Sequence, residues 1–159
     1  MKLRVDHLLV NVLDMDAAVH WYCDVLGMRE ASRTIIPLSD GSNIDNRVFE
    51  ADGDTFSVVV GQPIEPWGLK AQEVQRTGPG VHHVAYEVDD LAATVAELKS
   101  KGVEFLTDEP TDDGGLRQIF TRKDPVTEII HEFIQRTGGT RGFTSANMAN
   151  LAEASTRGA

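Results

Sequence analysis

The sequence contains a single cysteine, Cys23, so no disulfide can form within the chain and we expect a reducing compartment, the cytoplasm. Basic residues are scarce: 15 Lys and Arg stand against 25 Asp and Glu, a net charge of -10. Such a surface argues against binding to the phosphate backbone of nucleic acids. No apolar run approaches the ~20 residues of a membrane span, and the N-terminal segment lacks a signal-peptide cleavage pattern. We therefore expect a soluble protein with no membrane partner.

What the sequence does contain is an internal repeat. The segment VDHLLVNVLDMDAAVHWYCDVLGM, which begins at residue 5, aligns without a gap on VHHVAYEVDDLAATVAELKSKGV, which begins at residue 81. His7 then aligns with His83, and Asp14 with Asp90. A repeat of about half the chain indicates one domain made of two similar modules, which we place at residues 1–70 and 78–136.

The pattern of each module predicts a strand, a helix and about three further strands. The predicted fold class is therefore α+β with two βαβββ modules. Aspartate-rich turns precede both helices and suit helix N-caps, and a glycine follows each helix. The segment 62–80 is predicted to be a linker with at most one turn of helix. The predicted strands are 6–12, 47–51 and 55–61 in the first module, and 82–88, 103–106, 117–121 and 128–135 in the second. The apolar stripe of the first helix is Ala17, Ala18, Trp21, Tyr22, Val25 and Leu26, and that of the second is Leu91, Val95 and Leu98.

The aligned histidines fall on corresponding faces of their strands. Alternate residues from Val84 to Val88 are apolar and must cover the helix, and His82 belongs with them. His83 therefore points to the opposite face, as His7 does in the first module. A lone strand histidine is more often structural than a ligand, but two at matching repeat positions favour a shared site in a central cavity.

The last predicted strand supplies an acidic partner for these histidines. Glu132 shares a face with Ile130 and Ile134, where a carboxylate must be paired, ligated or protonated. Glu128 is a rival on the same face, but it stands at the entrance of the strand, where solvent is expected. His131 points to the other face and is expected to be structural. Two histidines and one carboxylate with open positions are the ligands of non-haem iron(II) oxygenases.

The paired modules and the residues His7, His83 and Glu132 resemble the vicinal oxygen chelate superfamily, which includes glyoxalases, bleomycin-resistance proteins and extradiol dioxygenases. The second half is most similar to the catalytic domain of the 4-hydroxyphenylpyruvate dioxygenase family, on the stretches GPGVHHVAYEVDD, LRQIFTRKD, EIIHEFIQR and GFTSANMANLAEA. The resemblance implies a half-open β-barrel around a central metal, with these three residues as ligands of iron(II). Manganese, cobalt, nickel or zinc are alternatives, since one such site accepts several metals.

The resemblance also implies which residues face the substrate. It places Gln118 and Phe120 on the strand before Glu132, and it implies a C-terminal lid helix at about residues 143–156. His82 stands where the family has a pocket glutamine, which conflicts with its core-facing placement unless a bulge turns it inward. Arg47 falls near a small polar pocket position and is a candidate for binding an anionic substrate, with a solvated charge at a strand edge as the alternative. The lid residues implied are Phe143, Asn147, Met148 and Leu151; Met148 and Ala152 replace aromatic residues of the family.

Three functions are open at this point. The leading one is an iron(II)-dependent dioxygenase that acts on a small organic acid, a 2-oxo acid, with dioxygen as co-substrate. The second is a metal-dependent isomerase or lyase of the glyoxalase I or methylmalonyl-CoA epimerase type, which takes a fourth ligand from the last strand of the first module. There, Val60 aligns with Glu132 and cannot bind metal, and Gln62 reaches the site only if the register slips by two. The third is a bleomycin-resistance-like binding protein, which needs no metal.

Unpaired sheet edges and apolar helix faces predict a homodimer.

Overall fold

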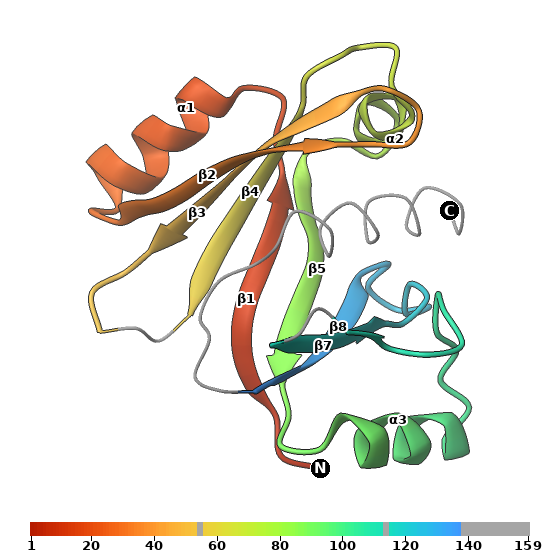
Figure 1. The fold of residues 1–159 in the computed structure, drawn as a ribbon. Helices are drawn as coiled ribbons and strands as arrows, with labels where there is room; N and C mark the ends of the chain where they lie inside the picture. Colours follow the sequence, from red (N-terminus) through yellow and green to blue (C-terminus); the bar gives the residue numbers. More distant parts are fainter. Residues whose placement is uncertain (54–55, 113–114, 138–159) are drawn as a thin grey trace. The chain divides into compact units, whose positions relative to one another are not determined.

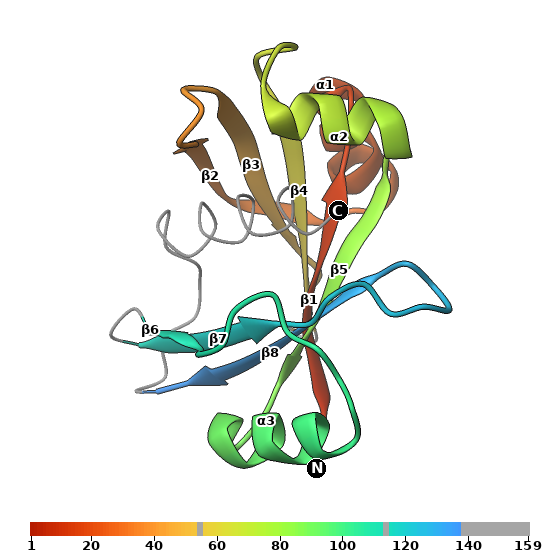
Figure 2. The same cartoon turned by 90° about the vertical axis from the view of Figure 1, so that its right-hand side faces the viewer.

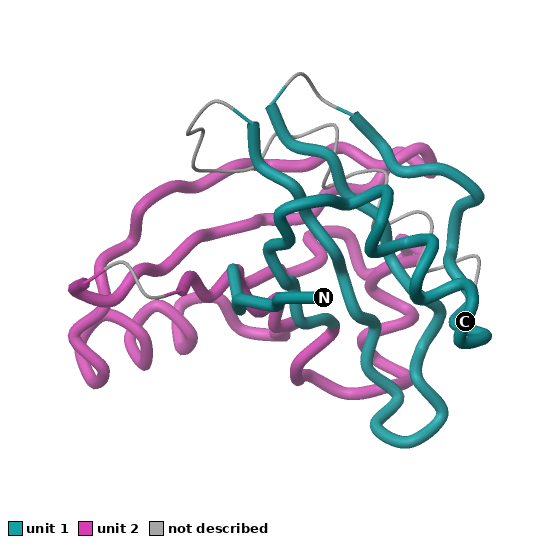
Figure 3. The backbone as a smooth tube through the Cα atoms, turned by 90° about the horizontal axis from the view of Figure 1, so that it is seen from below, with its two compact units in different colours: residues 1–6, 83–159 teal, residues 7–82 magenta. Residues whose placement is uncertain are grey.

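The computed structural model of the protein describes residues 1–53, 56–112 and 115–137. The chain forms two compact units (Figure 1, Figure 3). Unit 2 comprises His7–His82, and unit 1 comprises Met1–Asp6 together with the chain from His83 onward. No helix in the described ranges has the length and apolar character needed to span a membrane.

Unit 2 contains the first βαβββ module, followed by a further helix. Its sheet has the strand order β2-β3-β4-β1, in which β2, β3 and β4 are antiparallel and β4 is parallel to β1. The first three residues of β1 belong to unit 1. The elements are β1 (Arg4–Asn11), α1 (Met15–Val19), the π-helix η1 (His20–Val25), β2 (Arg29–Pro37), β3 (Asn43–Glu50), β4 (Ser57–Pro63) and α2 (Leu69–Thr77).

The core of unit 2 lies between its sheet and the helix pair α1 and η1 (Figure 1). Phe49 is fully buried there, and its ring stacks on Tyr22 with centroids 5.1 Å apart. The first helix was expected to bury one continuous stripe, but its second half is π-helical, and the wider winding changes which residues face the sheet. As a result Trp21, Val25 and Leu26 are exposed.

Unit 1 contains the second module. Its strands follow the order β5-β8-β7-β6, with β5 parallel to β8 and the other neighbours antiparallel. Helix α3 covers one face of β7 and β8 (Figure 2), where its buried side chains pack against Ile119 and Phe133. The elements are β5 (Gly80–Glu87), α3 (Leu91–Ser100), β6 (Thr111–Asp112), β7 (Leu116–Phe120) and β8 (Ile130–Arg136).

The two modules begin their helices with the same chemistry. Asp14 accepts a hydrogen bond from the backbone N–H of Ala17, and Asp90 accepts one from Ala93, both at 2.9 Å. Each aspartate is extended at the N-cap, as the turns predicted. The repeat is therefore present in the backbone as well as in the sequence, and the expected α+β class with two βαβββ modules is confirmed.

The last strand of each module supplies a second cap that the sequence analysis did not find. The side-chain oxygen of Gln62 accepts the N–H of Met15 at 2.6 Å, and that of Gln135 accepts the N–H of Leu91 at 3.0 Å. Each glutamine satisfies a first-turn donor that has no partner inside its helix. Both side chains are thereby turned toward a helix.

Three segments of the structure differ from the prediction. Strand β2 was not identified, because its alternation of polar and apolar residues is weak. The segment 62–80, expected to be a linker, contains the nine-residue helix α2. Its buried face includes Lys70 and Glu73, so the apolar period of the helix is hidden in the sequence. The segment 103–106 is not a strand; Phe105 makes a single bridge to Thr121.

Candidate metal centre

The candidate metal centre is built on β8 and its parallel neighbour β5. Glu132 is paired with Ala85 across these strands, and its side chain is 2 % exposed. Its same-face neighbours Ile130 and Ile134 are also buried, as alternation predicted, whereas Phe133 packs toward α3. A carboxylate in such surroundings requires a partner that offsets its desolvation.

His83 is that partner in unit 1. Its Nε2 lies 3.3 Å from Oε2 of Glu132, and the imidazole is 1 % exposed. Two ligands at about 2.1 Å from one metal ion, at right angles to each other, are about 3 Å apart. The pair therefore has the spacing of two ligands of a single divalent ion.

Strand β7 places two more predicted residues on this face. Phe120 is paired with Glu132, and its ring meets the His83 ring edge-on, with centroids 5.8 Å apart. Gln118 is paired with Ile134 and is 3 % exposed. The structure thus brings Gln118 and Phe120 to the side of Glu132, and their substrate-facing roles stay predictions.

His7 is the third predicted ligand. It directly follows Asp6 in β1, and Asp6 accepts two hydrogen bonds from the guanidinium of Arg136, at 2.9 and 3.0 Å. The side chain of His7 is buried within unit 2 and is only 3% exposed. Metal binding by His7 together with His83 and Glu132 stays a prediction.

Two other residues near Glu132, Glu128 before β8 and His131 on β8, differ from the predicted ligands in their surroundings. Glu128 is exposed and has a positive φ of 60°. His131 lies on the face opposite Glu132, where its Nε2 is 3.0 Å from the carboxylate of Asp124 and its ring stacks on Tyr86. His131 therefore lies on the expected face, and its structural role stays a prediction.

Asp124 organises the turn before β8 and gives a pH prediction. Its carboxylate accepts hydrogen bonds from the hydroxyl and N–H of Thr127, from the N–H of Val126 and from His131, and the Thr127 hydroxyl contributes most to lowering its pKa. Because its pKa is lower in the folded state, its stabilisation is present above about pH 4 and disappears as the pH falls below that value.

We expect Asp124→Asn to lower Tm at pH 7, with a difference from the parent that shrinks between about pH 4 and pH 2. Thermal melts followed by circular dichroism over this range measure it. The exposed Asp89→Asn serves as the control. A constant Tm difference at every pH would show that the Asp124 charge is not involved.

Two further candidates lie elsewhere in the chain's described part. Arg47 is on β3, which has a strand on each side, so the alternative of a strand-edge charge is wrong. Its guanidinium forms ion pairs with Asp45 at 3.2 Å and with Glu30 at 3.5 Å. His82 is half-buried and precedes His83, so alternation directs it to the other face of β5. Substrate binding by Arg47 and His82 stays a prediction.

The implied lid lies beyond the described residues. Its predicted side chains, Phe143, Asn147, Met148 and Leu151, all fall after residue 137, where the description ends. Their contribution to a substrate pocket stays a prediction.

Strand register corrects one part of the repeat alignment. Leu9 in β1 is paired with Val59, and its counterpart in the second module, Ala85, is paired with Glu132. The first-module equivalent of Glu132 is therefore Val59 and not Val60, which lies on the helix side in the core of unit 2. The position is a valine in either case, and neither valine can bind a metal.

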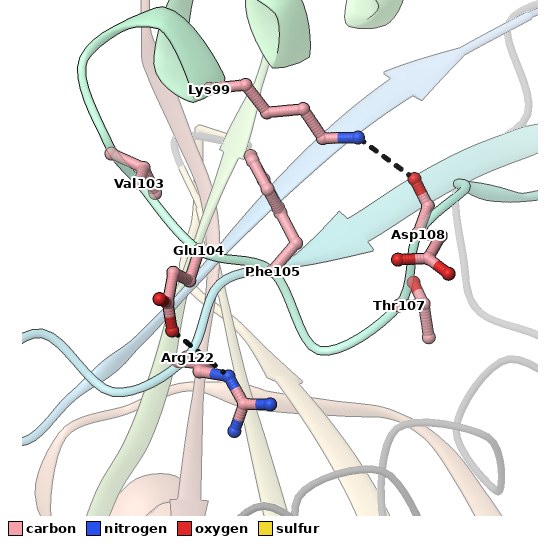
Figure 4. A pocket seen from close by; sticks show the side chains of 7 residues that line it. All are labelled: Lys99, Val103, Glu104, Phe105, Thr107, Asp108 and Arg122. Atoms are coloured by element: carbon pink, nitrogen blue, oxygen red, sulfur yellow. Dashed lines mark hydrogen bonds and ion pairs between the residues drawn. The ribbon is translucent and has the colours of Figure 1, made fainter.

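A separate pocket of about 340 Å³ opens on unit 1 after helix α3 (Figure 4). Three of its four charged side chains have partners: Lys99 donates to the backbone oxygen of Asp108 at 3.1 Å, and Arg122 is 3.4 Å from Glu104. No predicted site residue lines it. The lining residues are Lys99, Val103, Glu104, Phe105, Thr107, Asp108 and Arg122.

Two βαβββ modules, one with a buried histidine and the other with a buried histidine–glutamate pair, are features of a class of small α+β proteins suited to a divalent metal. The chain belongs to the glyoxalase/bleomycin resistance protein/dioxygenase superfamily, whose family model matches residues 6–121. The predicted superfamily is thereby confirmed, and the fold is that of its members.

Relatives of different activity are similar to this chain. The mitochondrial methylmalonyl-CoA epimerase of Mus musculus is 32% identical over 112 residues, which cover 67% of this chain and 57% of the relative. The 4-hydroxyphenylpyruvate dioxygenase of Dictyostelium discoideum is 25% identical over 195 residues, covering 94% and 52%. A structure of a 4-hydroxymandelate synthase mutant from Streptomyces coelicolor superposes with a TM-score of 0.83 at 27% identity, covering 98% and 55%. The chain thus spans about half the length of these relatives.

Proposed function

We propose that this protein is an iron(II)-dependent dioxygenase that binds the metal through His7, His83 and Glu132 and oxidises a small 2-oxo acid. The observation that carries this proposal is the ligand set. His83 and Glu132 form a buried pair in unit 1, with 3.3 Å between Nε2 and Oε2, and His7, at the matching position of the repeat, is buried in unit 2. Three protein ligands leave about three positions of an octahedron open.

The residues present fit a divalent ion. Glu132 carries a carboxylate among apolar neighbours, and a cation offsets the cost of burying that charge. Neutral imidazoles are common ligands of iron and of other transition metals. Held by these residues, iron(II) would supply the redox chemistry with dioxygen.

The neighbouring side chains have roles that follow from their positions. Phe120 meets the His83 ring edge-on, so it restrains the orientation of that imidazole. Ile130 and Ile134 flank Glu132 and exclude water from the carboxylate. Gln118 presents an amide on the same face, where it is suited to orient a substrate carboxylate or carbonyl group by a hydrogen bond.

A metal-dependent isomerase is the second candidate, supported by the similarity to a methylmalonyl-CoA epimerase. The resemblance to this superfamily implies that such enzymes use a fourth ligand from the last strand of the first module. In this chain the equivalent position is Val59, and the side chain of Gln62 is hydrogen-bonded to Met15. With a valine at that position the proposed set has three protein ligands, which favours open coordination and therefore oxygen chemistry.

A bleomycin-resistance-like binding protein is the third candidate, and it needs no buried metal ligands.

We further propose a cytoplasmic homodimer. We expect the second copy to contact η1, because the apolar side chains Trp21, Val25 and Leu26 are exposed in and directly after this helix. Exposed apolar patches often mark protein interfaces.

The test is metal analysis after anaerobic purification, followed by oxygen uptake. We expect about one iron per chain after reconstitution, and oxygen consumption that depends on a 2-oxo acid and yields carbon dioxide. Epimerisation of methylmalonyl-CoA and isomerisation of the glutathione–methylglyoxal adduct are measured in parallel on the cobalt-loaded protein. Either of these activities without 2-oxo-acid-dependent oxygen uptake would assign the protein to the isomerases. Retention of no metal would favour the binding protein.

A further inference from the structure

The turn between β2 and β3 lies beside the segment that leads into α2 (Figure 1). This segment, residues 64–69, has three exposed large apolar side chains: Ile64 is 47% exposed, and Trp67 and Leu69 are each 57% exposed. The Trp67 indole lies against the turn, because a Cβ atom added to Gly41 would be 3.8 Å from its Cη2 atom. Ile64, Trp67 and Leu69 therefore form an exposed apolar surface on unit 2, the Trp67 patch.

Hydrogen bonds fix the backbone beneath the Trp67 patch. Asp40 accepts the N–H of Leu69 at 2.9 Å, and it accepts the N–H and the hydroxyl of Ser42 at 2.9 and 2.6 Å. Glu65 accepts the N–H of Asn43 at 2.6 Å and the side-chain amide of the same residue at 3.0 Å. A surface held in this way loses little conformational entropy when a partner binds.

The same two carboxylates place negative charge beside the Trp67 patch. The Ser42 hydroxyl contributes most to lowering the pKa of Asp40, and the side-chain amide of Asn43 contributes most to lowering the pKa of Glu65. Both groups are therefore ionised at neutral pH. Within the described part of the chain, neither carboxylate forms an ion pair with a basic side chain. Their hydrogen bonds satisfy the oxygen atoms but leave the charge without a cation.

The compensating charge is best supplied by a different molecule. Arg33 and Arg47 of the β2–β3 hairpin are both bonded to Asp45. A second copy of this chain is a poor source, because the chain has a net charge of -10. A twofold interface on the Trp67 patch would also bring Asp40 and Glu65 of the two copies together.

We propose that the Trp67 patch, together with Asp40 and Glu65, is a docking surface for a basic segment of another protein, in which arginines alternate with apolar residues. A guanidinium is attracted by the two carboxylates and stacks well on an exposed indole. Apolar neighbours of the arginines would cover Ile64 and Leu69. Tryptophan is also enriched among the residues that dominate binding at protein interfaces. The proposal requires no metal and goes beyond the proposed function.

The probe is a synthetic peptide in which two arginines alternate with three leucines, and the matched peptide carries citrulline in place of arginine. Citrulline keeps the size of the side chain and removes its charge. The variant Trp21→Phe leaves Trp67 as the single tryptophan of the chain, so its fluorescence reports this surface. At low ionic strength, we expect a saturable change in Trp67 emission with the arginine peptide. The citrulline peptide should bind at least about fivefold more weakly.

Matched variants test the residues themselves, with a labelled arginine peptide followed by fluorescence anisotropy. Trp67→Ala should weaken binding at least about fivefold. Glu65→Gln keeps an acceptor for Asn43 and should weaken it about threefold. Two controls should stay within about twofold of the parent, since they remove a tryptophan that is 55% exposed and a carboxylate that is 77% exposed elsewhere in the chain: Trp21→Ala and Glu104→Gln.

Equal affinity for the arginine and citrulline peptides, or no binding of either, would overturn the inference. So would an unchanged affinity of folded Trp67→Ala, or an equal loss in the two controls. Circular dichroism melts verify the fold of each variant. If Trp67→Ala does not fold, the affinity of Glu65→Gln and the Trp67 emission decide the outcome. Because the experiment needs neither metal nor turnover, failure of the proposed function would leave its result unaffected.

Discussion

Replacing Glu132 with alanine is expected to abolish metal retention while the chain remains folded. Glu132 is the one anionic member of the proposed ligand set, and two neutral imidazoles alone bind a divalent ion weakly. We expect a loss in affinity of on the order of 100-fold or more, since even partners that only orient metal ligands contribute 10–100-fold. Without metal, removal of a carboxylate that is 2 % exposed also removes its desolvation cost.

Metal content after dialysis against a mild chelator measures the effect, and the melting temperature of the metal-free protein verifies the fold. Glu132→Gln keeps the side-chain volume and should lose metal to a similar extent. Glu128→Ala is the control, because Glu128 is exposed and precedes β8. Iron retained by Glu132→Ala and lost from Glu128→Ala would reverse the assignment of the carboxylate.

Replacing Arg136 with alanine is expected to lower the free energy of unfolding by about 2–4 kcal/mol, because it removes both hydrogen bonds that the guanidinium donates to the largely buried carboxylate of Asp6. The guanidinium contacts Asp6 through two hydrogen bonds, and the two side chains are only 12% and 14% exposed. Asp6 precedes His7 in β1, so we also expect metal to bind more weakly.

Urea unfolding of the metal-free protein measures the stability change. The Asp6→Ala, Arg136→Ala double variant should recover part of the loss, since both charges of the pair are then removed together. Arg4→Ala removes a neighbouring but exposed ion pair with Glu87 and should change stability by less than about 1 kcal/mol. Equal effects of Arg4→Ala and Arg136→Ala would show that burial does not strengthen the second pair.

The sequence by itself determined the features that depend on local pattern. The repeat aligned His7 with His83, and period-two alternation placed Glu132, Gln118 and Phe120 on buried faces of their strands. The Asp14 N-cap followed from a short motif in the same way. These predictions succeeded because neighbouring residues of a strand point to opposite faces and a cap acts within one turn of helix.

Only the tertiary structure decided which residues meet across strands. The equivalence of Val59 with Glu132 came from hydrogen-bond register, which a one-residue error in alignment conceals. Helix α2 was hidden because its buried face carries Lys70 and Glu73, which form an ion pair at 2.7 Å.

The Asp6–Arg136 pair joins residues 130 positions apart, and Asp40 of the β2–β3 turn accepts the N–H of Leu69 at the start of α2. Such contacts depend on strand order and register. Because these are set by packing over the whole chain, no short stretch of sequence encodes them.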